Sequence, residues 1–284
     1  MHSIQYGSPT FLFRDTHAKE LMTVIERIAQ CGYDGFELYG LFGEDPKKIR
    51  RKCDEVGICV MGDHIPYLEF SADPEGTIAK RVILGSPYIT IDKIPPEHLP
   101  GGKKFPDTVE TIHKIGEKCK NAGLQLLYHN HGYDFIDGKL DGKYVLEWIL
   151  DSVDPELLKY QPDLGWIELG GADPAYFLKK YMDRCPVIHL KDYYSTAPMR
   201  LSSAPELGYS RGGADYNYFE FRPTGYGIVN FAKYMPLVMA CDPKWLVADH
   251  DLSYERDVFK DLRDSLDYVK KIVELYPSEI WANR

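Results

Sequence analysis

Histidine and carboxylate residues recur directly after short apolar runs of this chain. His129 and His131 follow one such run, His189 lies within another, and Asp249 and Asp251 follow a third. Side chains two residues apart on a strand point the same way, so the members of each pair would share a face. Imidazoles and carboxylates together suit Mn, Zn, Co or Fe, or Mg where oxygens dominate. The pattern therefore predicts a site for a divalent metal or for acid–base catalysis.

Further polar residues end these and other apolar runs: Glu37, Asp63, His64, Asp92, Lys93, Asn130, Asp163, Lys191, Asp192 and His250. A single histidine at a strand end more often completes a hydrogen-bond network than binds a ligand, so the interpretation depends on the whole cluster. Glu37 is a candidate for contact with the substrate, but it could instead accept a hydrogen bond from a backbone N–H at the barrel rim. Lys191 and Asp192 could instead form a structural ion pair.

Eight strand–helix units account for these positions. We expect strands at 3–6, 35–39, 58–61, 88–91, 124–128, 158–162, 187–190 and 245–247, and helices at 18–30, 46–56, 74–84, 106–122, 144–150, 174–182, 228–239 and 255–275. Strands that alternate with helices form a parallel sheet, and eight units close into an α/β (β/α)8 TIM barrel, whose working residues lie at the carboxyl ends of the strands. The alternative is an open doubly wound sheet, but no GxGxxG motif follows the first strand.

The barrel is expected to be one domain over residues 1–284, with a long loop insertion at about 193–224 that is rich in Gly, Pro, Ser and Tyr. The net charge of −9 disfavours a nucleic-acid partner. The sequence has no apolar run of about 20 residues and no recognisable leader, which argues against a membrane protein. Six scattered cysteines without a CxxC pair suggest reduced thiols in a cytoplasmic protein. Homo-oligomerisation is left open.

Several segments together resemble a known superfamily. They are YHNHGYDF (128–135), QPDLGWIELGGADP (161–174) and IHLKD (188–192), with GFELYG (35–40), GYGIVNF (225–231) and LVADHD (246–251) in the expected order. They are similar to the xylose-isomerase-like barrels, and more narrowly to the sugar phosphate isomerase/epimerase group that includes inosose dehydratases. The resemblance covers nearly the whole chain and does not specify a substrate.

The resemblance implies a divalent metal (Mn, Zn, Co or Mg) held by residues from the last four strands. Asp163, His189 and Asp249 match three ligand positions, and the fifth strand offers either His129 or Asp134. Asp134 and Asp249 both stand where Glu is expected, so each carboxylate reaches one methylene less far. The metal would then shift, bind through water or be lost.

The resemblance also implies chemistry on a small sugar-like substrate, through proton removal next to a carbonyl. His131, Asp134 or Asp249 would be the base, while His64 and Lys191 would hold substrate oxygens. Residues 193–226 and Trp166 would cover the apolar face of the sugar. The expected activity is that of a sugar isomerase or epimerase.

Three other functions remain open at this stage. A lyase acting on an inosose or a 3-keto-glycoside would use the same site. An abasic-site endonuclease shares the fold, but the negative charge argues against it. A sugar-binding relative without catalysis would bind its ligand without turning it over.

Overall fold

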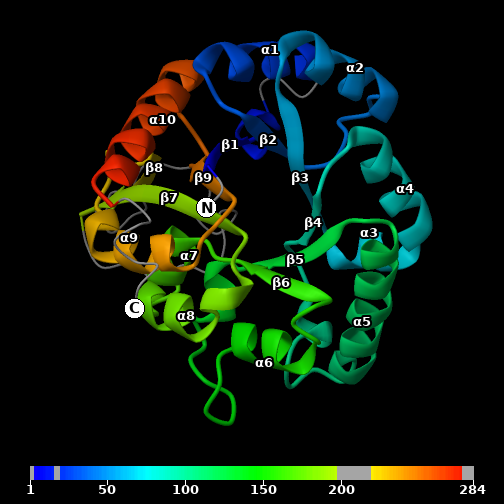
Figure 1. The fold of residues 1–284 in the computed structure, drawn as a ribbon. Coiled ribbons are helices and arrows are strands. Elements are labelled where there is room, and N and C mark those ends of the chain that lie inside the picture. The colour runs from blue at the N-terminus through cyan, green and yellow to red at the C-terminus, as the bar shows by residue number, and fades with distance from the viewer. Residues whose placement is uncertain (1–2, 16–19, 197–218, 277–284) are drawn as a thin grey trace.

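The protein is a ring of strands surrounded by helices, which Figure 1 shows in a view down the axis of the ring. The computed structural model describes residues 3–15, 20–196 and 219–276. The strands are β1 (Gln5–Pro9), β2 (Gly35–Leu38), β3 (Cys59–Ile65), β4 (Tyr88–Ile91), β5 (Gln125–His129), β6 (Leu158–Gln161), β7 (Val187–Ser195), β8 (Phe219–Arg222) and β9 (Trp245–Asp249). The helices are α1 (Leu21–Cys31), α2 (Pro46–Val56), α3 (Tyr67–Ala72), α4 (Pro74–Leu84), α5 (Phe105–Asn121), α6 (Val145–Ser152), α7 (Leu164–Leu169), α8 (Pro174–Lys180), α9 (Phe231–Ala240) and α10 (Val258–Glu274).

Within the described residues the sheet has the order β6-β5-β4-β3-β2-β1-β9-β7-β8. All neighbouring strands pair in parallel except β8, which is antiparallel to β7. The ring closes between β6 and β7 through a parallel bridge from Asp163 to His189, where the His189 N–H donates to the Pro162 carbonyl at 2.8 Å. The predicted (β/α)8 fold is therefore confirmed.

Local sequence signals set the limits of several helices. Asp45 caps α2 by accepting the Lys47 N–H at 2.7 Å, Pro46 occupies the first turn, and Gly57 ends the helix with a φ of +73°. The same Asp-Pro start and Gly end frame α4. These are the N-terminal and C-terminal preferences of helices, and they place each following strand in register.

A small apolar cluster fills the interior of the ring. It comprises Met61, Tyr88, Leu127, Val187, Trp245 and Val247. Gly7 makes this packing feasible, because a Cβ there would overlap Met61 Sδ. The much larger second cluster lies between the strands and the helices. The middle of the barrel is therefore filled with side chains.

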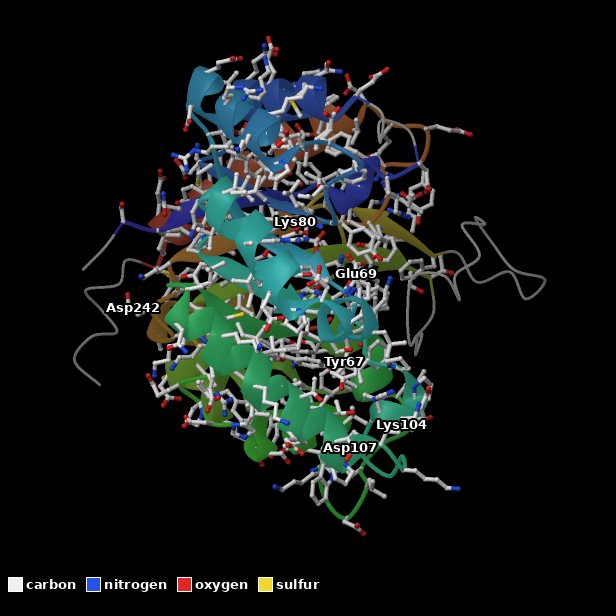
Figure 2. All side chains as sticks on the ribbon, turned by 90° about the vertical axis from the view of Figure 1, so that its right-hand side faces the viewer. Tyr67, Glu69, Lys80, Lys104, Asp107 and Asp242 are labelled. Atoms are coloured by element: carbon white, nitrogen blue, oxygen red, sulfur yellow. The ribbon has the colours of Figure 1, made fainter. Side chains whose placement is uncertain are left out.

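The side view in Figure 2 separates the two ends of the barrel. Asp242, close before β9, lies toward one end, whereas Tyr67 and Glu69 on α3, directly after β3, lie toward the other. The second end is the one at which the strands finish. No helix among the described residues is long and apolar enough to span a membrane.

Three features differ from the sequence prediction. The short helices α3 and α7 follow β3 and β6 where loops were expected. The predicted insertion at 193–224 begins and ends in strand, because β7 runs to Ser195 and pairs with β8. In each case the missed helix or strand is too short to show a clear periodicity of apolar residues. Residues 197–218 of the predicted insertion, and residues 18–19 of the predicted first helix, lie outside the described residues.

Candidate active site

The carboxyl ends of the strands surround a cavity of about 500 Å³. Of the predicted site residues, those that line it are Glu37, His64, His129, His131, His189, Lys191 and Asp249. They come from β2, β3, β5, β7 and β9 and from the residues directly after β5. The structure therefore brings seven of the nine predicted site residues to one cavity, and Asp134 and Asp163 do not line it.

Glu37 is the centre of one hydrogen-bond group. Its Oε2 lies 2.7 Å from His189 Nε2 and 3.2 Å from His64 Nε2, and its Oε1 accepts the Gln161 side-chain N–H at 2.6 Å. Burial alone would raise the pKa of Glu37, but His189 and His64 stabilise the charged form and lower this pKa below its usual range. Glu37 is therefore a buried, ionised carboxylate within the cavity rather than a rim residue that satisfies a backbone donor.

His189 and Lys191 share the carboxylate of Asp249. Asp249 Oδ2 lies 2.9 Å from His189 Nδ1 and 2.8 Å from Lys191 Nζ, and Lys191 also donates to Asp251 Oδ1 at 2.6 Å. Burial opposes charge on His189, yet Glu37 and Asp249 raise the pKa of its imidazole to about 10. The alternation along β7 turns Lys191 inward with His189, so Lys191 pairs with Asp249 and Asp251 and not with Asp192.

Asp163 is fully buried behind the residues that line the cavity. Its Oδ1 accepts the Trp166 N–H at 2.9 Å as the N-cap of α7, and its Oδ2 lies 3.8 Å from His129 Nε2 and 3.7 Å from Lys191 Nζ. Burial raises the pKa of Asp163 above its usual range, and Lys191 offsets this only in part. Gln161 holds His129 from the other side, with 3.1 Å between its Oε1 and His129 Nδ1.

Two overlapping groups bring suitable ligand atoms together. In one, His64, His129 and His189 place ligand atoms within 4.8 Å of one another; in the other, Asp163, His189 and Asp249 do so. Asp163 Oδ2 is buried and makes no hydrogen bond with any described residue. An unbonded buried oxygen costs free energy, and a cation beside it would satisfy it. The mixed oxygen and nitrogen donors therefore fit a divalent metal.

Asp134, the alternative ligand, is not brought into either group. It is buried, its Oδ1 accepts the Tyr128 hydroxyl at 2.8 Å, and its Oδ2 accepts the His131 backbone N–H at 2.8 Å. The turn at Gly132–Asp134 folds this carboxylate back under the chain. Of the two alternatives on the fifth strand, the geometry favours His129.

His131 lines the cavity between two aromatic rings. Its ring stacks on Tyr133 with the centroids 5.4 Å apart and lies 5.7 Å from Trp166. Its Nδ1 has no hydrogen-bond partner among the described residues. Burial, and then the cations Lys93 and Lys191, lower the pKa of His131 well below its usual range, so the ring is neutral. A neutral imidazole with an unused nitrogen can accept a proton.

Several residues in or behind the cavity wall were missed by the sequence prediction or given no role. Gln161 links His129 to Glu37, and its only signal was its place as a polar residue at the end of an apolar strand. Asp92 and Asp251 were noted at strand ends but were given no role. Phe11 and Tyr39 also line the cavity, and their aromatic composition gave no signal.

Asp192 points to the outer side of β7 and holds the loop before α9. Its Oδ1 accepts the backbone N–H groups of Tyr193 and Val229, and its Oδ2 accepts those of Gly225 and Gly227, all at 2.9 to 3.1 Å. The motif GYG is required here, because a Cβ on Gly227 would overlap the Asp192 carboxylate. The exposed Tyr226 between the two glycines does not line the cavity.

Two proteins with similar sequences are described as inosose dehydratases. The chain is 24% identical over 192 residues to an inosose dehydratase of Geobacillus kaustophilus (strain HTA426), a match that covers 60% of this chain and 61% of that protein. It is 28% identical over 142 residues to an inosose dehydratase of Bacillus cereus (strain AH820), with 49% and 44% covered. The matches thus span about half of the length of these relatives.

Solved structures share the fold over almost the full chain. A sugar phosphate isomerase/epimerase from Parabacteroides distasonis ATCC 8503 has a TM-score of 0.68 at 19% identity, with 98% of this chain and 96% of that chain covered. A protein described as a probable 3-DHS dehydratase of petrobactin synthesis in Bacillus anthracis has a TM-score of 0.71 at 15% identity, with 94% and 99% covered. The family described as Xylose isomerase-like TIM barrel matches residues 25–272. The chain belongs to this family of xylose isomerase-like TIM barrels.

Proposed function

We propose that this protein is a metal-dependent enzyme that removes a proton next to the carbonyl of a small sugar, keto-sugar or sugar phosphate, as an isomerase or epimerase does. The main support is the group of Asp163, His189 and Asp249, whose ligand atoms lie within 4.8 Å of one another and in which the buried Asp163 Oδ2 makes no hydrogen bond with a described residue. Proton transfer of this kind needs a positioned base and a means of stabilising negative charge on the substrate oxygen.

The position of each residue in the site suggests its role. His129, Asp163, His189 and Asp249 would hold the metal, which when bound would polarise the oxygens of the substrate. The unused Nδ1 of His131 would take the proton from carbon. Lys191 and His64 would bind substrate oxygens from the cavity wall, and Glu37 would hold the two histidines His64 and His189 in place. Trp166 would cover the substrate and exclude water.

A lyase is the second candidate, favoured by the inosose dehydratases among the relatives. Its first step is the same proton removal, and only the fate of the intermediate differs. In an isomerase or epimerase the proton returns to a carbon, whereas in a dehydratase a neighbouring hydroxyl leaves as water with help from an acid. Both outcomes would use His131 and Lys191.

Metal binding can be tested with a matched pair of variants. The protein is stripped with a chelator and titrated with Mn²⁺ or Zn²⁺ by calorimetry. Asp163→Ala and His189→Ala are expected to abolish binding, while Asp134→Asn, whose carboxylate lies outside both ligand groups, is expected to bind like the wild type. Absence of metal uptake by the folded wild type would refute the metal centre.

Turnover can be tested through solvent exchange. The metal-loaded protein is incubated in D₂O with a panel of keto-sugars and inososes, and NMR follows the loss of the proton next to the carbonyl. We expect exchange in the wild type and a loss of roughly 10²–10⁴-fold in His131→Ala. Product analysis then separates an isomer or epimer from a dehydrated product. No exchange over the whole panel would favour a sugar-binding protein without catalysis.

A further inference from the structure

The cavity extends beyond its polar end into a second, largely apolar region. Phe11, Tyr39, Pro66, Leu68, Ile94 and Pro95 line this outer wall. Phe11 and Tyr39 meet edge to face, with ring centroids 4.7 Å apart, so they form a rigid aromatic corner. Leu68 is 51% exposed although it lines the cavity, which leaves apolar surface open to water. An exposed apolar wall of this kind is typical of a binding region.

Asp92 provides an unused polar group in the same part of the cavity. Its side chain is 2% exposed, lines the cavity, and has an Oδ1 without a hydrogen-bond partner among the described residues. Tyr133 connects it to the polar end, because the Tyr133 hydroxyl donates to the Asp92 carbonyl at 2.8 Å while its ring stacks on His131. A buried carboxylate oxygen with no partner is a strong acceptor for a ligand hydroxyl.

The charges of the outer wall argue against a phosphate group there. Lys93 is the cation that lines this part of the cavity, and its Nζ already donates to the Tyr39 hydroxyl at 2.7 Å. Lys93 stands next to the Asp92 carboxylate, which offsets its charge and would repel an anion. The outer region is therefore suited to a neutral group with hydroxyls and an apolar face.

We infer that the outer wall is a second subsite, which binds the ring attached to the reacting sugar, so that the natural substrate is a glycoside and not a free monosaccharide. This inference rests on the proposed function in one respect, namely that the reacting ring binds among His131, His189 and Lys191. The attached ring lies with its apolar face against Phe11 and Tyr39. The volume of about 500 Å³ lies within the range of about 300–1,000 Å³ common for sites that hold ligands larger than a single small ring.

The test measures binding without turnover, so it is separate from the exchange experiment. Calorimetry on the Mn²⁺-loaded protein compares glucose, galactose and mannose with their phenyl β-glycosides, with cellobiose and lactose, and with glucose 6-phosphate. We expect at least one glycoside to bind roughly tenfold tighter than its parent sugar, as one stacked ring provides. The phenyl glycosides and the disaccharides distinguish an aryl group from a second sugar ring.

Variants test whether these residues cause the tighter binding of the glycosides. Phe11→Ala and Tyr39→Ala should remove the tenfold advantage and leave the Kd of the parent sugar within about twofold, while Asp92→Asn should weaken the disaccharide more than the phenyl glycoside. Tyr176→Ala, an exposed aromatic residue on α8 outside the cavity, is the control. The inference is overturned when no glycoside in the panel binds tenfold tighter than its parent, when glucose 6-phosphate binds tightest, or when the aromatic variants keep the advantage.

Discussion

Asp134 gives the sharpest prediction, because its carboxylate is buried without any cation beside it. Tyr128 and the His131 backbone N–H are its two hydrogen-bond donors. Burial raises the pKa of Asp134 to about 7, and these two hydrogen bonds offset the shift only in part. We consider the change Asp134→Asn, in which the amide oxygen still accepts from His131 and the amide nitrogen donates to the Tyr128 hydroxyl.

The size and sign of the effect follow from proton linkage. The pKa of Asp134 rises by about 3 units from an unfolded value near 4 to about 7 in the folded protein, and each unit corresponds to about 1.4 kcal/mol. A carboxyl group with a raised folded pKa binds more protons in the folded state than in the unfolded chain. Its contribution to stability is therefore fully present below about pH 4 and is lost as the pH rises to about 7. The total loss is about 4 kcal/mol.

The assay compares urea unfolding of wild type and Asp134→Asn between pH 4 and pH 8. We expect similar free energies of unfolding near pH 4, and a variant that becomes more stable than the wild type by about 2–4 kcal/mol near pH 8. Other titrating groups are common to both proteins and cancel in the difference. A difference that does not change with pH would contradict the buried, proton-binding state of Asp134, and loss of metal binding in the same variant would return Asp134 to the ligand set.

The remaining predictions concern residues outside the cavity that hold loops and helices in place. Asp192→Ala leaves four backbone N–H groups without their acceptor and should lower the free energy of unfolding by about 3–5 kcal/mol in urea titrations. Gly227→Ala places a Cβ against the Asp192 carboxylate and should cost about 1–3 kcal/mol, visible as a lower Tm. Asp63→Asn removes the charge that two N–H groups of Arg81 bind at 2.6 and 2.9 Å, and should cost about 3 kcal/mol in the same titrations. If a variant is as stable as the wild type, the stabilising role proposed for that residue is wrong.

Much of the fold and of the polar wall could be predicted from sequence because both depend on regular spacing. Short apolar runs separated by capped helices fix the order of the strands, and a parallel barrel places the end of every strand at one mouth. Residues as distant as Glu37 and His189 could therefore be assigned to one site. Asp163 could be assigned in the same way, since it directly follows β6 and begins α7.

The rest depends on short irregular segments and on contacts that spacing does not encode. Asp134 looked equivalent to His129 as a ligand, but a single turn at Gly132–Asp134 directs its carboxylate away from the metal groups. Phe11 lies in a three-residue 3-10 helix, which has no periodic pattern to recognise. Asp92 is informative only because its Oδ1 lacks a partner, a property of the packed structure that the sequence does not contain.

Asp249 orients His189, a role that its side chain fulfils although it is one methylene shorter than glutamate. A metal-binding histidine usually gives its second nitrogen to a carboxylate, which fixes the orientation of the ring. Asp249 Oδ2 lies 2.9 Å from His189 Nδ1, so this short side chain orients His189 and directs Nε2 toward Glu37. The longer Glu37 reaches within 2.7 Å of Nε2 from β2, on the other side of the ring. Both ring nitrogens of His189 are thus held, by an aspartate on β9 and by a glutamate on β2, and a bound metal would have to displace Glu37 from Nε2.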